Sequence, residues 1–203
     1  MTSHITFNTS SPLALPHTLL TSLNSLISSA ITYPSVFSYF FAFSLKFEVW
    51  YQPKFNSHTG KIVGSEALIR WRADDGSLIS PGRFIPLFEK NGNIIRLDEY
   101  VFREVCRQQK EWQKEGIQIL PVSVNISRFS LYYSNVVEKY ERIINYYDVD
   151  HKYVQIEIKE SAIIENTVIV ELIQKFHDAG FDILLDDFGN GYSSLASLNQ
   201  MPT

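Results

Sequence analysis

Apolar and polar residues alternate in five short stretches between residues 47 and 187, a pattern typical of β-strands. The predicted strands are residues 47–55, 61–71, 119–127, 153–161 and 182–187. Between the second and fifth strands the apolar spacing becomes helical, which predicts helices over residues 82–91, 94–114, 133–147 and 166–178. Only the short turn sequence Asn-Ser-His-Thr-Gly separates the first two strands, so we expect them to pair antiparallel.

The order of these elements predicts an α/β fold with a mostly parallel sheet, because helical segments alternate with strands after the opening hairpin. Each predicted strand has one mainly apolar face and one face that carries polar groups. In the second strand, Glu66, Leu68 and Arg70 share the face opposite Ala67 and Ile69. A sheet covered by helices on both sides is nearly all apolar. A barrel explains the asymmetry, since its outer face meets helices while its inner face carries the chemistry at one mouth.

The polar face predicts a site rich in oxygen ligands. Strand parity assigns to it Glu66, Asn125, Glu157 and Asp186, with Asp187 beside them. Carboxylates this close repel one another unless a cation or shared protons compensate them. The all-oxygen set suits a hard divalent cation such as Mg²⁺ or Mn²⁺, and the adjacent aspartates could reach two ions, an arrangement used in phosphoryl chemistry. Arg70 could hold a phosphate group.

Composition narrows the functional classes. The chain has 203 residues and a net charge of −4. It therefore lacks the excess of basic residues that is typical of proteins that bind nucleic-acid polymers. Its only cysteine, Cys106, excludes a disulfide framework. Residues 1–45 contain no charged residue and form an uncharged leader to which no domain is assigned. Pro34 and several serines argue against a membrane span there, so we expect a cytoplasmic protein, with membrane association through residues 18–45 as the alternative.

Four motifs occur in order along residues 46–203: "YQPKF…TGKIVGSEALIRW", "SVNIS", "EIKES" and "DDFGNGYSSL". Together they closely resemble the EAL domain of bacterial cyclic di-GMP phosphodiesterases, whose signature triplet matches Glu66-Ala67-Leu68. The resemblance implies a modified TIM (β/α)₈ barrel with an antiparallel first strand. It also implies hydrolysis of one phosphodiester bond of cyclic di-GMP to give linear pGpG.

The same resemblance implies roles for individual residues. The metal ligands would be Glu66, Asn125, Glu157, Asp186 and Asp187, holding two Mg²⁺ or Mn²⁺ ions. Of these, Glu66, Asp186 and Asp187 would be catalytic. Leu68 and Arg70 would contact cyclic di-GMP. Glu160 would steady the loop 187–194, which couples metal binding to formation of a homodimer in relatives.

The sequence departs from the family pattern in three places. Lys159 and Asn190 stand where Thr is usual. The chain stops at Met201-Pro202-Thr203, where relatives continue toward Asp-x-Leu-Lys-Ile-Asp, so the lysine of that strand, a later metal-site glutamate and the last barrel strands are expected to be missing. The barrel is therefore expected to be incomplete, which puts the activity of this chain in question.

Two alternatives to a phosphodiesterase stay open. One is a non-catalytic module that binds cyclic di-GMP or a protein partner, which the missing lysine and glutamate would favour. The other is a truncated product that does not fold alone, because an unclosed barrel leaves an exposed strand edge and uncovered apolar surface.

Overall fold

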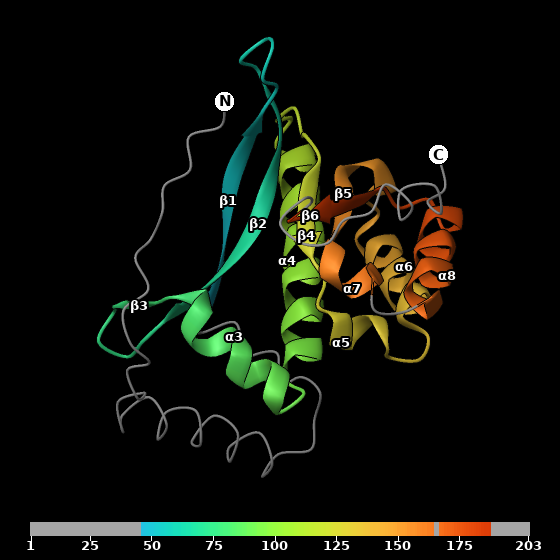
Figure 1. Cartoon of the computed structure of the whole chain (residues 1–203). Helices are drawn as coiled ribbons and strands as arrows, with labels where there is room; N and C mark the ends of the chain where they lie inside the picture. The colour runs from blue at the N-terminus through green and yellow to red at the C-terminus, as the bar shows by residue number, and fades with distance from the viewer. Residues whose placement is uncertain (1–45, 165–166, 188–203) are drawn as a thin grey trace. The chain divides into compact units, whose positions relative to one another are not determined.

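The computed structural model describes residues 46–164 and 167–187, which form one mixed sheet with helices packed on it (Figure 1). The strands are β1 (Phe47–Phe55), β2 (Ile62–Arg72), β3 (Leu78–Ile79), β4 (Val122–Asn125), β5 (Val154–Lys159) and β6 (Ile183–Asp186). The helices are α3 (Pro81–Lys90), α4 (Ile94–Lys114), α5 (Arg128–Leu131), α6 (Val136–Tyr147), α7 (Glu160–Ile164) and α8 (Thr167–Asp178), with a 3₁₀ turn η1 (His151–Tyr153). The predicted leader, residues 1–45, lies outside the described residues.

The strands follow the order β1-β2-β4-β5-β6, and the short β3 pairs with β2. β1 and β3 run antiparallel to β2, whereas β2, β4, β5 and β6 are parallel neighbours. This confirms the predicted opening hairpin and the mostly parallel sheet. Within residues 46–187, β1 and β6 are the outer strands, so the sheet corresponds to part of a barrel whose first strand is antiparallel.

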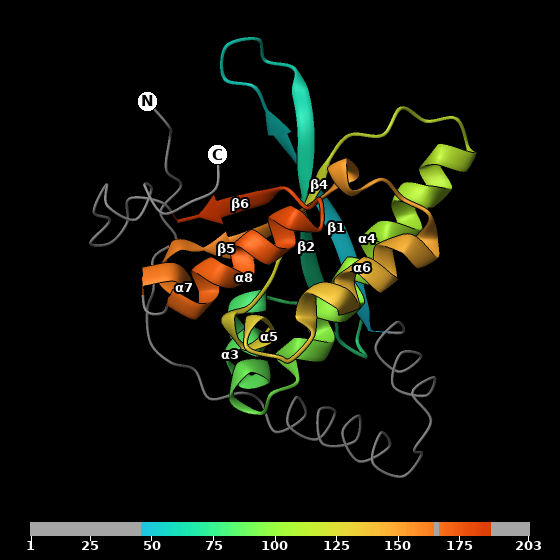
Figure 2. The same cartoon turned by 90° about the vertical axis from the view of Figure 1, so that its right-hand side faces the viewer.

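The helices cover the apolar face of the sheet. Leu97, Val101 and Val105 recur at helical spacing and are buried, which gives α4 an apolar stripe that packs on β1, β2 and β4. α6 packs beside α4, and α8 packs on both α6 and β6 (Figure 2). In β4 and β5, Val124 and Ile156 are fully buried. The polar residues that alternate with these apolar ones therefore project from the opposite face of the sheet.

Four aromatic side chains fix α3 against the hairpin. Phe47 of β1 and Trp71 of β2 meet Phe84 and Phe88 of α3, with ring centroids between 5.4 Å and 6.3 Å apart. Most of these pairs meet edge to face, the geometry that aromatic rings prefer in cores. All four side chains are buried, so the cluster holds α3 at the end of the sheet where β2 finishes.

Several predicted boundaries were wrong by one to three residues, at both ends of the elements. The strand predicted at 153–161 ends at Lys159, because the chain turns into α7 at Glu160. The strand predicted at 119–127 ends at Asn125, and Ser127 then caps the short α5 by accepting a hydrogen bond from the backbone N–H of Ser130. The chain therefore leaves the sheet sooner than alternation alone indicates.

Gly64 lies where β2 approaches the chain just before β4 most closely. A Cβ atom at Gly64 would lie 2.7 Å from the Pro121 carbonyl oxygen, which also accepts a 2.9 Å hydrogen bond from the Ser65 N–H. We expect Gly64→Ala to push β2 away from β4 and lower the free energy of unfolding by about 1–3 kcal/mol in urea titrations. Gly82→Ala in α3, where the nearest atom is 3.9 Å away, is the control and should not destabilise the protein. Equal stabilities for the two variants would contradict the close approach.

Candidate functional site

The sheet register brings the polar residues of neighbouring strands onto a common face. Glu66 of β2 pairs with Ser123 of β4, and Asn125 pairs with Glu157 of β5. In the next pair of strands, Lys159 stands opposite Asp186. Residues paired across parallel strands point to the same side of a sheet, and so do residues two apart on one strand. Glu66, Asn125, Glu157 and Asp186 therefore share one face, as parity predicted.

The central acidic groups contact an amide and an ammonium group rather than one another. Asn125 Nδ2 donates a 2.7 Å hydrogen bond to Glu66 Oε1. Lys54 Nζ lies 2.7 Å from Glu157 Oε2 and 2.8 Å from Ser123 Oγ. Lys54 reaches this position because it stands opposite Gly64 in the hairpin, two residues from the partner of Glu66. The polar face thus carries its own positive charge.

The two aspartates at the end of β6 are arranged differently. Asp187 adopts the left-handed backbone region with φ 60°, and its N–H donates a 2.8 Å hydrogen bond to Asp186 Oδ1. Lys159 Nζ lies 3.5 Å from Asp187 Oδ2, and both side chains are more than half exposed. Such an exposed ion pair contributes little to stability. The Asp187 carboxylate is therefore free to change partners.

The acidic side chains do not form a ready-made cluster. Among residues 46–164 and 167–187, no three His, Cys, Asp or Glu side chains converge closely enough to hold a metal ion. The structure brings together Glu66 with Asn125, and Glu157 with Lys54, but leaves these two pairs as separate contacts. In donor chemistry the residues fit a hard cation, because all are carboxylate or amide oxygens on one face. Their present positions do not form a metal site, because Glu66 is bonded to Asn125 and Glu157 to Lys54, so these contacts must change before the oxygens can surround one ion.

The pKa of Glu66 is affected by burial and by the other charged groups on this face. Burial raises the pKa of the Glu66 carboxyl above its usual value, and the charges of Glu157 and Asp186 raise it further. The hydrogen bond from Asn125 and the charge of Lys54 act in the opposite direction and partly offset this effect. Glu66 is half-buried, so its negative charge is stabilised by a cation at this face.

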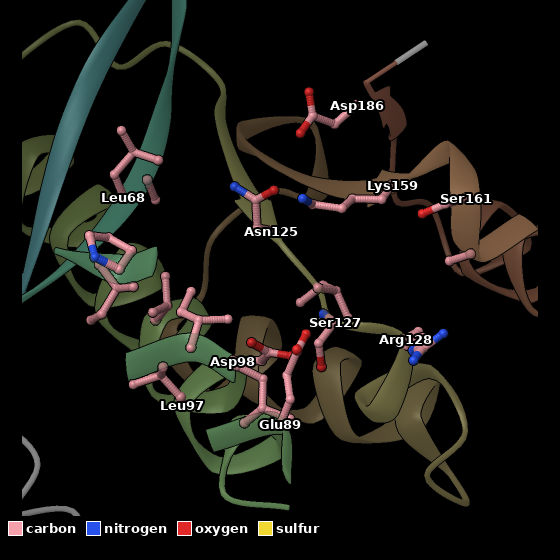
Figure 3. A pocket seen from close by; sticks show the side chains of 18 of the residues that line it. Leu68, Glu89, Leu97, Asp98, Asn125, Ser127, Arg128, Lys159, Ser161 and Asp186 are labelled. Atoms are coloured by element: carbon pink, nitrogen blue, oxygen red, sulfur yellow. Dashed lines mark hydrogen bonds between the residues drawn. The ribbon is translucent and has the colours of Figure 1, made fainter. Parts of the chain in front are cut away.

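A pocket of about 500 Å³ opens beside the polar face, at the carboxyl ends of β2, β4, β5 and β6. It is lined by Leu68, Arg70, Asn125 and Asp186, and it extends to Asp98 of α4 (Figure 3). Both residues expected to contact substrate therefore line the pocket, whereas Glu66 and Glu157 do not. The lining mixes apolar side chains with charged and polar ones of both signs, and a concave site of this size suits a ligand rather than a bare ion.

Arg70 of β2 belongs to the lining of this pocket. Its Nη1 donates a 2.9 Å hydrogen bond to the Ile69 carbonyl oxygen, and its guanidinium carbon lies 5.7 Å from the centre of the Trp50 ring. These contacts use only part of a group that has five N–H donors in a planar fork. The remaining donors could bind a phosphate in two-pronged fashion.

Sequence reasoning missed two charged residues in this region. Lys54 stands in the motif "YQPKF", and its spacing of two from Gln52 could have indicated the polar face, but only once the hairpin register was known. Asp98 lies on the apolar side of the helix predicted at 94–114. A carboxylate at such a position could have indicated a buried polar contact. Both were hidden because their partners are distant in sequence.

Asp98 ties α4 to the turn that follows Asn125. It is buried, and its Oδ2 accepts hydrogen bonds from the Ser127 N–H at 2.9 Å and from Ser130 Oγ at 2.7 Å. Figure 3 shows Asp98 near Glu89 at the end of the pocket opposite Asp186. Burial raises the pKa of Asp98 to about 6, and the hydrogen bonds from Ser127 and Ser130 act to lower it.

The remaining predicted features are only partly described. Glu160 is buried at the first position of α7. The loop that it was expected to steady, 187–194, lies outside the described residues beyond Asp187, and so does Asn190. In the part of the chain that the structure describes, no helix is both long and apolar enough to cross a membrane.

A protein-family model described as the EAL domain matches residues 42–203. Among curated proteins, the bifunctional diguanylate cyclase/cyclic di-GMP phosphodiesterase MucR of Pseudomonas aeruginosa is 33% identical over 153 residues, which are 75% of this chain and 22% of that protein. The cyclic di-GMP phosphodiesterase PdeR of Escherichia coli is 36% identical over 155 residues, which are 76% of this chain and 23% of that protein. The chain thus spans less than a quarter of the length of these relatives.

Solved structures match the fold as well. The "PaMucR Phosphodiesterase, c-di-GMP complex" is 28% identical, with a TM-score of 0.76 over 91% of this chain and 69% of that chain. The EAL enzyme Bd1971 in its cAMP- and cyclic-di-GMP-bound form is 25% identical, with a TM-score of 0.71 over 89% of this chain and 49% of that chain. Both neighbours are described as bound to cyclic di-GMP.

The buried Asp98 should make stability depend on pH. An unfolded aspartate releases its proton near pH 4, whereas the folded pKa is about 6. The folded chain therefore binds more protons between these values, and this group's contribution to stability falls as pH rises through them. Relative to Asp98→Asn, the wild-type free energy of unfolding should drop by about 2 kcal/mol between pH 4 and pH 6.5 in urea titrations. A pH-independent difference, or one that rises, would contradict the buried carboxyl.

Proposed function

The chain belongs to the EAL domain family, and we propose that residues 46–203 provide a divalent-metal-dependent site that hydrolyses cyclic di-GMP to linear pGpG. The observation that carries this proposal is the common face of Glu66, Asn125, Glu157 and Asp186, next to a pocket lined by Arg70. The match to the family model and the relatives named as cyclic di-GMP phosphodiesterases support it.

The proposed reaction opens the ring of the dinucleotide at one of its two phosphates. A water oxygen forms a bond to phosphorus, the bond from phosphorus to the 3′-oxygen breaks, and the leaving oxygen takes up a proton. The product keeps one intact phosphodiester and gains a terminal 5′-phosphate. Water is the only other reactant, and no oxidant is needed.

The residues that would hold the metal are Glu66, Asn125, Glu157, Asp186 and Asp187, and two Mg²⁺ or Mn²⁺ ions would match this number of oxygen donors. When bound, such cations lower the pKa of water and offset the charge of the phosphate. Glu66, Asp186 and Asp187 would be the catalytic carboxylates. The raised pKa of Glu66 supports its part in this set, because a half-buried carboxylate beside other acids is stabilised by added positive charge.

Leu68 and Arg70 would bind the substrate. Leu68 would lie against an apolar part of the ligand, and Arg70 would bind a phosphate through its guanidinium donors. Their place in the lining of the pocket supports this assignment, as does the cyclic di-GMP bound by the structural neighbour PaMucR. The same proposal includes a cytoplasmic location. It also includes a homodimer that forms through the 187–194 region, with Glu160 stabilising that loop.

One observation favours a second function, a module that binds cyclic di-GMP without cleaving it. Glu157 already has an ammonium partner in Lys54, and the acidic groups of the described residues do not form a three-ligand cluster. A site that keeps these contacts could still bind the dinucleotide through Arg70 and the pocket. Calorimetry with cyclic di-GMP in the presence and absence of Mn²⁺ separates the two functions when it is combined with product analysis.

The proposed hydrolysis is tested by incubating the full chain with cyclic di-GMP and Mn²⁺ and separating the products by chromatography. We expect pGpG to accumulate, and Glu66→Gln to reduce its rate by at least about 100-fold, because loss of one catalytic carboxylate removes several kcal/mol of transition-state stabilisation. Glu171→Gln, on an exposed position of α8, is the charge-matched control and should retain the wild-type rate. Absence of pGpG from a preparation that is folded by circular dichroism would refute the proposal for this chain.

The substrate-binding role of Arg70 gives an independent test. Arg70→Ala should weaken cyclic di-GMP binding by about 10–100-fold in calorimetry, since a hydrogen bond to a charged group contributes about 1.5–3 kcal/mol. The control is Arg142→Ala on α6, which removes the same charge away from the pocket and should leave the affinity unchanged. Equal affinities for all three proteins would rule out a phosphate contact by Arg70.

A further inference from the structure

The polar face holds a positive charge that belongs to the protein itself. The ammonium group of Lys54 donates to Glu157 Oε2 at 2.7 Å and to Ser123 Oγ at 2.8 Å. Ser123 is completely buried, and the Glu157 side chain is only 7% exposed. This contact is therefore not a mobile surface ion pair of the kind formed by Lys159 and Asp187.

Because Glu157 is buried, its ion pair with Lys54 affects how strongly Glu157 can bind any other cation. A buried carboxylate that loses its cation partner is strongly destabilised, so Glu157 keeps Lys54 unless another cation takes its place. Glu157 Oε2, which the ammonium occupies, is also an oxygen that a metal ligand at this position would offer. The positive charge of the ammonium group therefore opposes coordination of a metal ion through the same oxygen.

We propose that Lys54 is an internal cation that competes with the divalent metal for Glu157, so that metal binding requires the ammonium group to leave. This inference rests on the proposed function, because it assumes that Glu157 binds metal. It accounts for the lack of a three-ligand acidic cluster in the described residues while their donor chemistry suits a hard cation. The metal affinity of this chain then depends on how much more strongly Glu157 binds the metal ion than the Lys54 ammonium group. The presence of Lys54 therefore weakens metal binding.

The strand geometry makes departure of Lys54 feasible. β1 is an outer strand within residues 46–187, and the Lys54 side chain is 35% exposed. The hairpin register shifts between Lys54 and Phe55, which marks an irregularity at this residue. A long, flexible lysine at such a position can turn its ammonium group toward solvent without moving the sheet.

Manganese titration by calorimetry tests the competition directly. Lys54→Gln removes the charge and keeps a polar side chain, and we expect its Kd for Mn²⁺ to fall about tenfold relative to wild type. Lys54→Arg keeps a positive charge at the site, so its Kd should not fall. Lys61→Gln, in the exposed turn of the same hairpin, removes an equal charge and should match wild type. Equal or weaker Mn²⁺ binding by Lys54→Gln would overturn the inference.

A second measurement uses the unaltered chain and holds even if Lys54→Gln fails to fold. Acetylation of lysines by a water-soluble ester, read by peptide mass spectrometry, should become several-fold faster at Lys54 when Mn²⁺ is added, while Lys61 stays unchanged as the internal reference. An unchanged rate at Lys54 in the presence of saturating Mn²⁺ would overturn the inference. If pGpG is still released in that case, the proposed function survives; if neither wild type nor Lys54→Gln binds Mn²⁺, both fail together.

Discussion

The mutual repulsion of carboxylates on one face of a sheet is the constraint on which the rest of this structure depends. Glu66, Glu157 and Asp186 share that face because strand parity and parallel register leave them no other direction. The consequence appears in Glu66, whose pKa is raised by burial and by the two neighbouring acids. Asn125 and Lys54 partly compensate this repulsion, one as a hydrogen-bond donor to Glu66 and the other as a full charge beside Glu157.

Packing of the apolar face of the same strands fixes the direction in which these charged side chains point. The buried valines of β4 pack against α4, and the valine and isoleucines of β5 are buried on the same face, so the alternate residues of those strands have a fixed direction. Asp98 extends this control beyond the sheet, since it joins α4 to the turn that follows Asn125. Helix packing thus determines the position of the polar groups, and the polar groups determine which ligand the sheet can accept.

Much of this organisation could be predicted from the sequence, because it rests on local patterns. Alternation predicted the opening hairpin and the common face, and four ordered motifs predicted the family. Contacts between distant segments could not be predicted in the same way. Lys54 and Glu157 are 103 positions apart, and nothing in either motif indicates their partner. The ends of the strands were also misjudged, because Ser127 and Glu160 begin short helices whose signals are weaker than the strand pattern before them.

Anomalous diffraction at the manganese edge would show whether a divalent cation binds on the polar face. Crystals of the full chain grown with Mn²⁺ and cyclic di-GMP should show a strong peak within about 2.5 Å of oxygens from Glu66, Asn125, Glu157 and Asp186. In the same crystals the Lys54 ammonium group should have left Glu157. Manganese bound only elsewhere on the chain, with Lys54 still on Glu157, would show that the polar face is not a metal site.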